Sequence, residues 1–267
     1  MTEPATSPQP VAQRWARRGA RGFLDFVLPV SCVACGATVA GAATHGRAGG
    51  RQLMCGCCWA ALPVLPHPRC DRCGHPRRVG AAAAHAACAW CDLLPPYVRA
   101  CRSACWVPDG SGGEIVRALK YGGWRATADA IGARVGALDW PADVVAECAA
   151  AVPVPLGAGR LRERGYNQST LIARAAAATW GVPVWDDVLT RSRATRAQAR
   201  LTAGDRLTNV AGAFRAGDGA HARLRGAHVV LVDDVVTTAA TLNACAAALV
   251  AGGARVVSYA TFGRAWS

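Results

Sequence analysis

The sequence is almost without lysine: Lys120 is the single one, against 29 arginines. Alanine is abundant as well, and this combination is typical of a coding bias that acts on a whole genome. The formal net charge of +13 therefore does not by itself indicate a nucleic-acid partner. It predicts a diffuse basic surface, which suits ligands that carry phosphate.

The chain also lacks the apolar segments that membranes and secretion require. It has no run of about 18 apolar residues that could span a bilayer. The stretch Gly22–Pro29 is too short for the apolar region of a secretion signal and contains Asp25. We therefore expect a cytoplasmic protein with no membrane span and with reduced cysteines. Residues 1–22 are polar, contain several Pro and Arg, and are expected to be disordered.

Cysteine, in contrast, is plentiful: the chain has 13, and eight of them form four Cys-x-x-Cys pairs. Two cysteines at this spacing can aim both sulfurs at one ion, and two such pairs complete a closed tetrahedral site. We predict two structural Zn²⁺ ions in a module over residues 23–96. The predicted ligands are Cys32, Cys35, Cys55, Cys58, Cys70, Cys73, Cys88 and Cys91. Pairing in sequence order is the default, although interleaved pairing fits the spacing equally well.

The remaining cysteines and the nearby histidines have less defined roles. Cys57 lies between two predicted ligands and is ambiguous. A histidine could replace a cysteine ligand, but solvent-exposed loop positions are preferred for His67, His75 and His85. Apolar neighbours predict small core residues at Cys101, Cys105, Cys148 and Cys245.

Residues 97–267 alternate apolar strands with helical segments, which indicates a parallel α/β sheet. Pro95-Pro96 marks the boundary with the cysteine-rich module. Strands are expected at 102–107, 149–155, 182–189, 228–232 and 255–260, and helices at 114–120, 127–138, 167–180 and 241–250. Residues 190–209 show little periodicity and are expected to form a loop or flap.

One segment of this domain combines acids with hydroxyls. The apolar strand Val229–Val232 is followed by Asp233 and Asp234, and then by a helix start that contains Thr237, Thr238 and Thr241. Ligands of open α/β sheets bind at the carboxyl ends of strands, and N–H groups at a helix start favour phosphate. Two acids beside such a loop suit ribose hydroxyls, contacted directly or through Mg²⁺. A simple capped helix would explain one acid and one threonine, but not the whole set.

The segment Val229–Thr241 resembles the 13-residue phosphoribosyl pyrophosphate motif of type I phosphoribosyltransferases. More narrowly, residues 23–264 resemble the ComF family of competence-associated predicted phosphoribosyltransferases. Besides the cysteine pairs, the resemblance includes Leu119-Lys-Tyr-Gly122, Val152-Pro-Val-Pro155, Arg164-Gly-Tyr-Asn-Gln168, and a run with Arg193, Gln198, Arg206, Asn209 and Phe214. It implies a type I phosphoribosyltransferase fold over residues 97–267, with a parallel-sheet core, flanking helices and a flap. A double zinc-ribbon domain would precede it over residues 23–96.

The resemblance also implies a reaction, in which a nitrogen nucleophile displaces pyrophosphate from the ribose of phosphoribosyl pyrophosphate in the presence of Mg²⁺. Asp233 and Asp234 would orient the ribose and stabilise its developing positive charge. The implied substrate-binding positions are Thr237, Thr238, Ala239, Ala240, Thr241, Lys120, Pro153, Val154, Pro155, Arg160, Arg164 and Asn167. The flap would contribute Arg193, Gln198 and Arg206.

Several of these positions have structural alternatives. Lys120 could be a cation at a helix C-terminus, the arginines near Arg160 could lie on an exposed helix start, and Asn167 could be a helix cap. The family usually has glycine where this chain has Ala239, and at positive φ an alanine is strained by about 1 kcal/mol.

No residue pattern identifies the acceptor. The competing hypothesis is therefore a sensor that binds phosphoribosyl pyrophosphate or a nucleotide without turnover. Its zinc module and basic surface would engage single-stranded DNA or a helicase-type partner of DNA uptake.

Overall fold

The computed structural model describes residues 31–39, 54–77, 88–107, 110–121, 125, 127–192 and 212–265. Its centre is a four-stranded sheet in the order β1-β6-β5-β2, in which every neighbouring pair is parallel. The strands are β1 (Val98–Val107), β2 (Cys148–Pro153), β5 (His228–Val236) and β6 (Val256–Ala265). Parallel sheets are covered on both faces, which is why these strands are nearly continuous apolar runs. The predicted parallel α/β sheet is confirmed.

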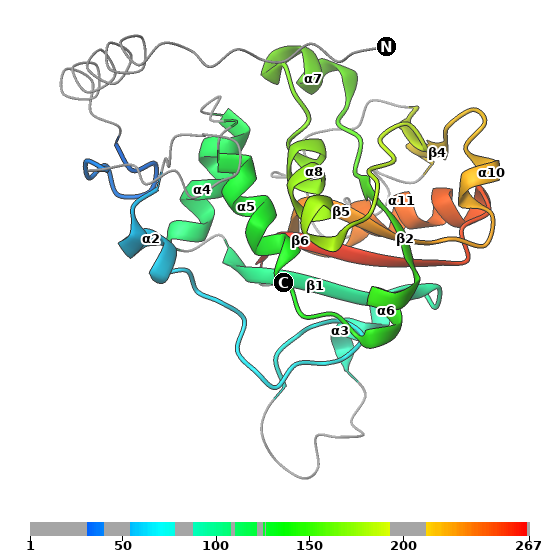
Figure 1. Cartoon of the computed structure of the whole chain (residues 1–267), viewed down its shortest axis with the longest axis horizontal. Coiled ribbons are helices and arrows are strands. Elements are labelled where there is room, and N and C mark those ends of the chain that lie inside the picture. The colour runs from blue at the N-terminus through cyan, green and yellow to red at the C-terminus, as the bar shows by residue number, and fades with distance from the viewer. Residues whose placement is uncertain are drawn as a thin grey trace, which may run out of the picture.

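Helices lie on both faces of the sheet (Figure 1). One face carries α4 (Gly110–Tyr121), α5 (Thr127–Gly136) and α8 (Gln168–Trp180). The other face carries α11 (Ala240–Ala251) and the antiparallel pair of β3 (Leu189–Arg191) and β4 (Phe214–Ala216). Among the described residues of this domain there are also the short helices α6 (Ala142–Glu147), α7 (Ala158–Arg164) and α10 (His221–Leu224). Two apolar cores result, one on each side of the sheet.

Local sequence explains the limits and the close packing of α8. The side chain of Asn167 accepts a hydrogen bond from the Ser169 N–H and caps the first turn, while Gly181 ends the helix at φ 70°. On α5, a Cβ at Gly132 would overlap the Cβ of Ala175 on α8. The missing side chain therefore lets the two helices approach each other closely.

The cysteine-rich module contains little regular structure besides α2 (Gly56–Ala60) and α3 (Ala89–Asp92). Its turns follow the Cys-x-x-Cys pattern, with Gly36 and Gly74 at φ 72° and 68° directly after the second cysteine of a pair. Glycine reaches positive φ without the Cβ clash of other residues, so it suits these tight turns.

This module covers the outer edge of β1, where the cyan segment in Figure 1 runs beneath the strand. The Cys101 N–H donates to the Arg72 carbonyl at 2.7 Å, and the Trp106 N–H donates to the Pro63 carbonyl at 2.8 Å. The guanidinium of Arg264 on β6 is buried and donates to the Cys73 carbonyl at 2.6 Å. The module is therefore joined to the sheet by backbone pairing as well as by side chains.

Two expectations about strands were wrong. Residues 182–189 do not form a strand: Val184 makes one isolated parallel bridge to Ala151, and β3 begins only at Leu189. Strand β5 does not end before the acids, because Asp233 still pairs with Thr261 of β6. The expected disorder of residues 1–22, and the flap beyond Ser192, lie outside the described residues. No described helix is long and apolar enough to cross a membrane.

Candidate functional site

A cavity of about 730 Å³ lies at the carboxyl ends of the sheet strands. Val107 of β1, Asp233 of β5 and Ala265 of β6 line it, together with Val154 directly after β2. Helices α4, α7 and α8, strand β3, and the loops after β2 and before α11 also contribute lining residues. This is the edge of an open parallel sheet at which ligands bind, because the loops that leave the strands converge there.

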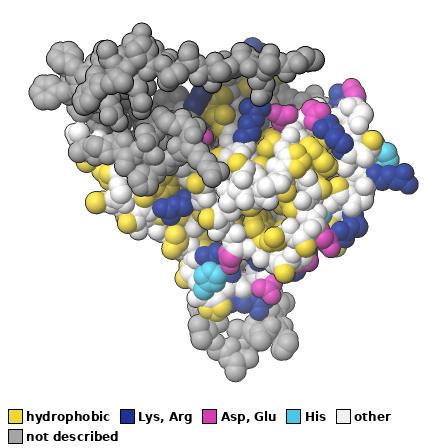
Figure 2. Space-filling model, in the orientation of Figure 1, with side chains coloured by type: hydrophobic (Ala, Val, Ile, Leu, Met, Phe, Trp, Pro, Cys, Tyr) yellow, Lys and Arg dark blue, Asp and Glu magenta, His cyan; other side chains and the backbone are white. Residues whose placement is uncertain are grey.

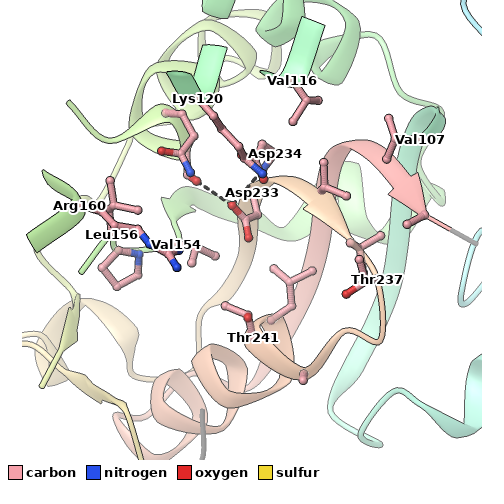
Figure 3. A pocket seen from close by; sticks show the side chains of 18 of the residues that line it. Val107, Val116, Lys120, Val154, Leu156, Arg160, Asp233, Asp234, Thr237 and Thr241 are labelled. Atoms are coloured by element: carbon pink, nitrogen blue, oxygen red, sulfur yellow. Dashed lines mark hydrogen bonds and ion pairs between the residues drawn. The ribbon is translucent and has the colours of Figure 1, made fainter. Parts of the chain in front are cut away.

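The two acids occupy the middle of the cavity (Figure 3). Asp233 Oδ1 accepts hydrogen bonds from Ser169 Oγ at 2.8 Å and from the Asp234 N–H at 2.9 Å. Burial, followed by the neighbouring charge of Asp234, raises the pKa of Asp233 from 3.8 to about 7. Asp234 is buried and pairs with Lys120, whose Nζ lies 2.9 Å from Asp234 Oδ2. The structure thus gives the two adjacent carboxylates different partners.

The loop after the acids forms the floor of the cavity. Thr237, Ala239, Ala240 and Thr241 line it. Thr238, in contrast, does not, and its Oγ1 is buried with no hydrogen-bond partner among the described residues. The first turn of α11 has no side-chain cap, which leaves its N–H groups oriented for an anion.

Ala239 adopts φ 58° and ψ 5°, and it is the one residue other than glycine with positive φ in the described part of the chain. The family usually has glycine at this position, and glycine adopts positive φ without strain. The alanine keeps the shape of the loop at a cost of about 1 kcal/mol.

The opposite wall follows β2. Val154, Pro155 and Leu156 line the cavity, as do Arg160 and Arg164 on α7. Pro153 does not reach the cavity, because it is buried inside β2 opposite Val232. Of the three predicted substrate-binding residues in this segment, Val154 and Pro155 therefore remain candidates and Pro153 does not.

Two other predicted positions are engaged by the protein itself. Asn167 Nδ2 donates to the Val154 carbonyl at 3.0 Å while its oxygen caps α8, and Asn167 does not line the cavity. It therefore positions the loop after β2 instead of facing a ligand. Lys120 does line the cavity, but its ammonium group is paired with Asp234.

Among the lining residues that sequence reasoning missed, Ser169 and Arg191 carry polar or charged side chains. Ser169 orients Asp233, and Arg191 reaches the cavity from β3, with its guanidinium carbon 5.2 Å from the centre of the Phe214 ring. Burial, with a contribution from Arg160, lowers the pKa of Arg191. Arg191 lies at the start of the segment expected to be a flap, whereas the flap residues named from the sequence, Arg193, Gln198 and Arg206, lie outside the described residues.

Away from the cavity, eight cysteines form two clusters, in sequence order along the chain. One contains Cys32, Cys35, Cys55 and Cys58, and the other contains Cys70, Cys73, Cys88 and Cys91. Within each cluster the sulfurs lie within 4.8 Å of one another, and three pairs are 3.5, 3.5 and 3.7 Å apart. Sulfurs bound tetrahedrally to one Zn²⁺ are about 3.8 Å apart, so each cluster fits a structural zinc ion. The interleaved alternative is excluded by this grouping.

Four other cysteines, which lie in the α/β domain, and His75 of the module partly match expectation. Cys101, Cys105 and Cys245 are buried, as predicted for core cysteines, and Cys148 packs at the margin of a core. His75 is not a solvent-exposed loop residue: its ring stacks on Trp90 with 5.1 Å between ring centres. This contact could not be predicted from the sequence, because His75 and Trp90 lie in different segments of the module.

Comparison with known proteins supports the zinc-ribbon module and identifies the family of the chain. A model of the double zinc ribbon domain matches residues 23–102. DNA utilization protein YhgH of Escherichia coli K12 is 32% identical over 200 residues, which cover 70% of this chain and 80% of that protein. The chain belongs to the ComF family.

Other members of the ComF family match over shorter stretches. YhgH of Salmonella typhi is 41% identical over 107 residues, which cover 40% of this chain and 45% of that protein. Competence protein F of Haemophilus influenzae is 36% identical over 94 residues, covering 35% and 41%. Together with the two cysteine clusters, the ribbon match supports two structural zinc ions. The expected fold class, a parallel α/β domain with a zinc-ribbon module, is confirmed.

Proposed function

We propose that this chain binds phosphoribosyl pyrophosphate in the cavity and transfers its phosphoribosyl group to a nitrogen acceptor, with release of pyrophosphate. The observation that carries the proposal is the arrangement around the acids. Asp233 and Asp234 lie between Arg160 on one side and Thr237 of the helix start on the other (Figure 3). Thr241 and Arg164 line the same cavity. A sugar that carries phosphate at both ends matches this order of groups.

Each part of the cavity has a role in this proposal. The loop from Thr237 to Thr241 would hold the 5′-phosphate with hydroxyls and N–H groups. The arginines of α7, with Arg191, would hold the pyrophosphate. The two carboxylates would hold the ribose hydroxyls and stabilise positive charge at C1. Mg²⁺, if bound with the substrate, would neutralise the pyrophosphate, and carboxylate oxygens are ligands that suit it.

Isothermal titration with Mg-phosphoribosyl pyrophosphate tests the binding step. We expect saturable binding that weakens at least tenfold, about 1.4 kcal/mol, in Asp234→Asn. Asp186→Asn is the matched control, because Asp186 is about half-exposed and pairs with Arg174 at 3.0 Å, outside the cavity. Absence of saturable binding by the unmodified chain would refute the proposal.

A second candidate is a sensor that binds the same ligand without turnover and acts through a DNA-related partner. The names of the relatives, DNA utilization protein and competence protein, favour it. On the face shown in Figure 2, however, Lys and Arg side chains are interspersed with Asp and Glu instead of forming one continuous basic patch. A pyrophosphate-release assay with a panel of bases and amines separates the candidates. Binding without release for every acceptor would favour the sensor.

A further inference from the structure

The cavity has a second half with a different chemistry. Five residues form what we term the apolar lobe: Val107, Gly113, Val116, Val235 and Ala265. Figure 3 shows Val107 and Val116 on one side of the acid pair, and Val154, Leu156 and Arg160 on the other. None of the five lobe residues has a polar side chain. The roles proposed above for phosphate and ribose leave this half of the cavity unused.

One side of the apolar lobe is formed by residues of the sheet strands. Val107 and Val235 flank Gly263 of β6, where a Cβ would lie 2.8 Å from a methyl of Val107 and 3.1 Å from one of Val235. Helix α4 forms the opposite side and directs Gly113, Val116 and Lys120 at the cavity. The spacing of three and four residues places them on one face of the helix. Gly113 adds no side chain to this side of the cavity, so Val116 is the apolar side chain that α4 contributes there.

The stereochemistry of displacement at a sugar carbon determines on which side of the ribose the acceptor must lie. The incoming atom approaches C1 from the face opposite the leaving group, through an oxocarbenium-like transition state. If the pyrophosphate lies against Arg160 and Arg164, the acceptor must lie across Asp233 and Asp234, on the side of Val107 and Val116. We propose that the apolar lobe is the acceptor subsite and that it takes an uncharged, planar heteroaromatic nitrogen compound. This inference rests on the proposed function.

The bond changes balance without another reactant. The lone pair of the ring nitrogen forms the C1–N bond as the bond between C1 and the pyrophosphate oxygen breaks. Pyrophosphate leaves with that electron pair, and the N–H proton of the acceptor passes to water. An acceptor nitrogen that carries no proton gives the cationic product by the same displacement.

Charge decides which acceptors fit. A carboxylate placed among aliphatic side chains loses its hydration and gains no partner, so its burial is strongly unfavourable. Lys120, the cation that α4 brings to the cavity, already pairs with Asp234 at 2.9 Å. The negative charge of that pair's carboxylate also repels an anionic acceptor. Apolar walls, in contrast, favour the face of an aromatic ring, which buries a large apolar area.

The test compares uncharged acceptors with related acceptors that carry a carboxylate, using the zinc-loaded full chain and Mg-phosphoribosyl pyrophosphate. Pyrophosphate release is measured with nicotinamide against nicotinate, and with uracil against its carboxylated form orotate. We expect release with at least one uncharged member and a kcat/KM at least tenfold lower for its carboxylated partner. Equal or faster release with the carboxylated members would overturn the proposal while leaving the proposed function intact.

Variants of the lobe give a second readout. Val116→Asp is expected to lower kcat/KM for the uncharged acceptor at least tenfold, with the Kd for phosphoribosyl pyrophosphate changed less than threefold. That unchanged Kd also reports an intact fold, and Val116→Ala serves in its place if the aspartate variant does not fold. Val145→Asp is the control, since Val145 is 67% exposed on α6. Phosphoribosyl pyrophosphate binding with no release for any of these acceptors would overturn the acceptor assignment and favour the sensor. No binding at all would instead refute the proposed function.

Discussion

Replacing Asp233 with asparagine should stabilise the folded protein, and increasingly so as the pH rises. The folded-state pKa of Asp233 is raised from 3.8 to about 7, so folding takes up a proton in this range. Stability contributed by this group is therefore complete at low pH and is lost as the pH rises through 7. The difference of about three pKa units corresponds to about 4 kcal/mol at pH 8, and to about 2 kcal/mol at pH 5. Asparagine avoids this cost because it does not ionise.

The geometry allows the substitution. Asparagine keeps the Oδ1 acceptor that receives hydrogen bonds from Ser169 and from the Asp234 N–H. We expect the melting temperature at pH 8 to rise by up to about 10 °C, and at pH 5 by roughly half as much. Thermal unfolding at pH 5, 6, 7 and 8, with the zinc concentration constant, measures this difference between the variant and the unmodified chain.

Asp186→Asn is the control, because Asp186 lies outside the cavity, pairs with Arg174 at 3.0 Å, and its replacement leaves Asp233 and its neighbours unchanged. The reasoning is refuted if Asp233→Asn is less stable at pH 8, or if its advantage is the same at every pH. If Asp233→Asn is more stable at pH 8 and also loses phosphoribosyl pyrophosphate binding, the acid contributes to function at the expense of stability.

Three further predictions concern the zinc module. Gly74→Ala should destabilise the chain by about 3 kcal/mol in thermal unfolding, since its Cβ would overlap the Cys101 carbonyl, whereas Gly36→Ala should cost only about 1 kcal/mol because its surroundings are open. Arg264→Met should cost about 2 kcal/mol or more, because the buried guanidinium is replaced and the carbonyl of Cys73 loses its donor; unchanged unfolding would contradict this contact. Removal of zinc by a chelator should release two ions per chain by metal analysis and lower the melting temperature of the whole chain; a transition confined to the module would show that it is not coupled to the sheet.

The sequence predicted the elements whose signals are local. Helix α8 has a capping Asn167 and a terminating Gly181, and its limits agree with the structure to within a residue. The end of β5 was placed too early because two charged residues favour a loop. The backbone of Asp233 nevertheless stays paired with β6, and only its side chain leaves the sheet for the cavity.

Contributions that depend on distant pairing were not predictable. Arg191 reaches the cavity from β3, where Thr190 pairs with Arg215, 25 residues away. The sequence pattern does not indicate this antiparallel pair. Ser169 contacts Asp233 across 64 residues, and a serine in the first turn of a helix usually has only a local role. Such residues become recognisable only when the chain is folded.

The cover over β1 has a consequence for the behaviour of the protein in solution. An edge strand with free N–H and carbonyl groups pairs readily with strands of other molecules, which leads to aggregation. Here the Cys101 and Trp106 N–H groups are occupied by carbonyls of Arg72 and Pro63, which belong to the zinc module. Zinc binding thereby protects an edge of the sheet from pairing with other molecules. Protein purified without sufficient zinc should therefore aggregate and become turbid before any defect at the cavity is measured.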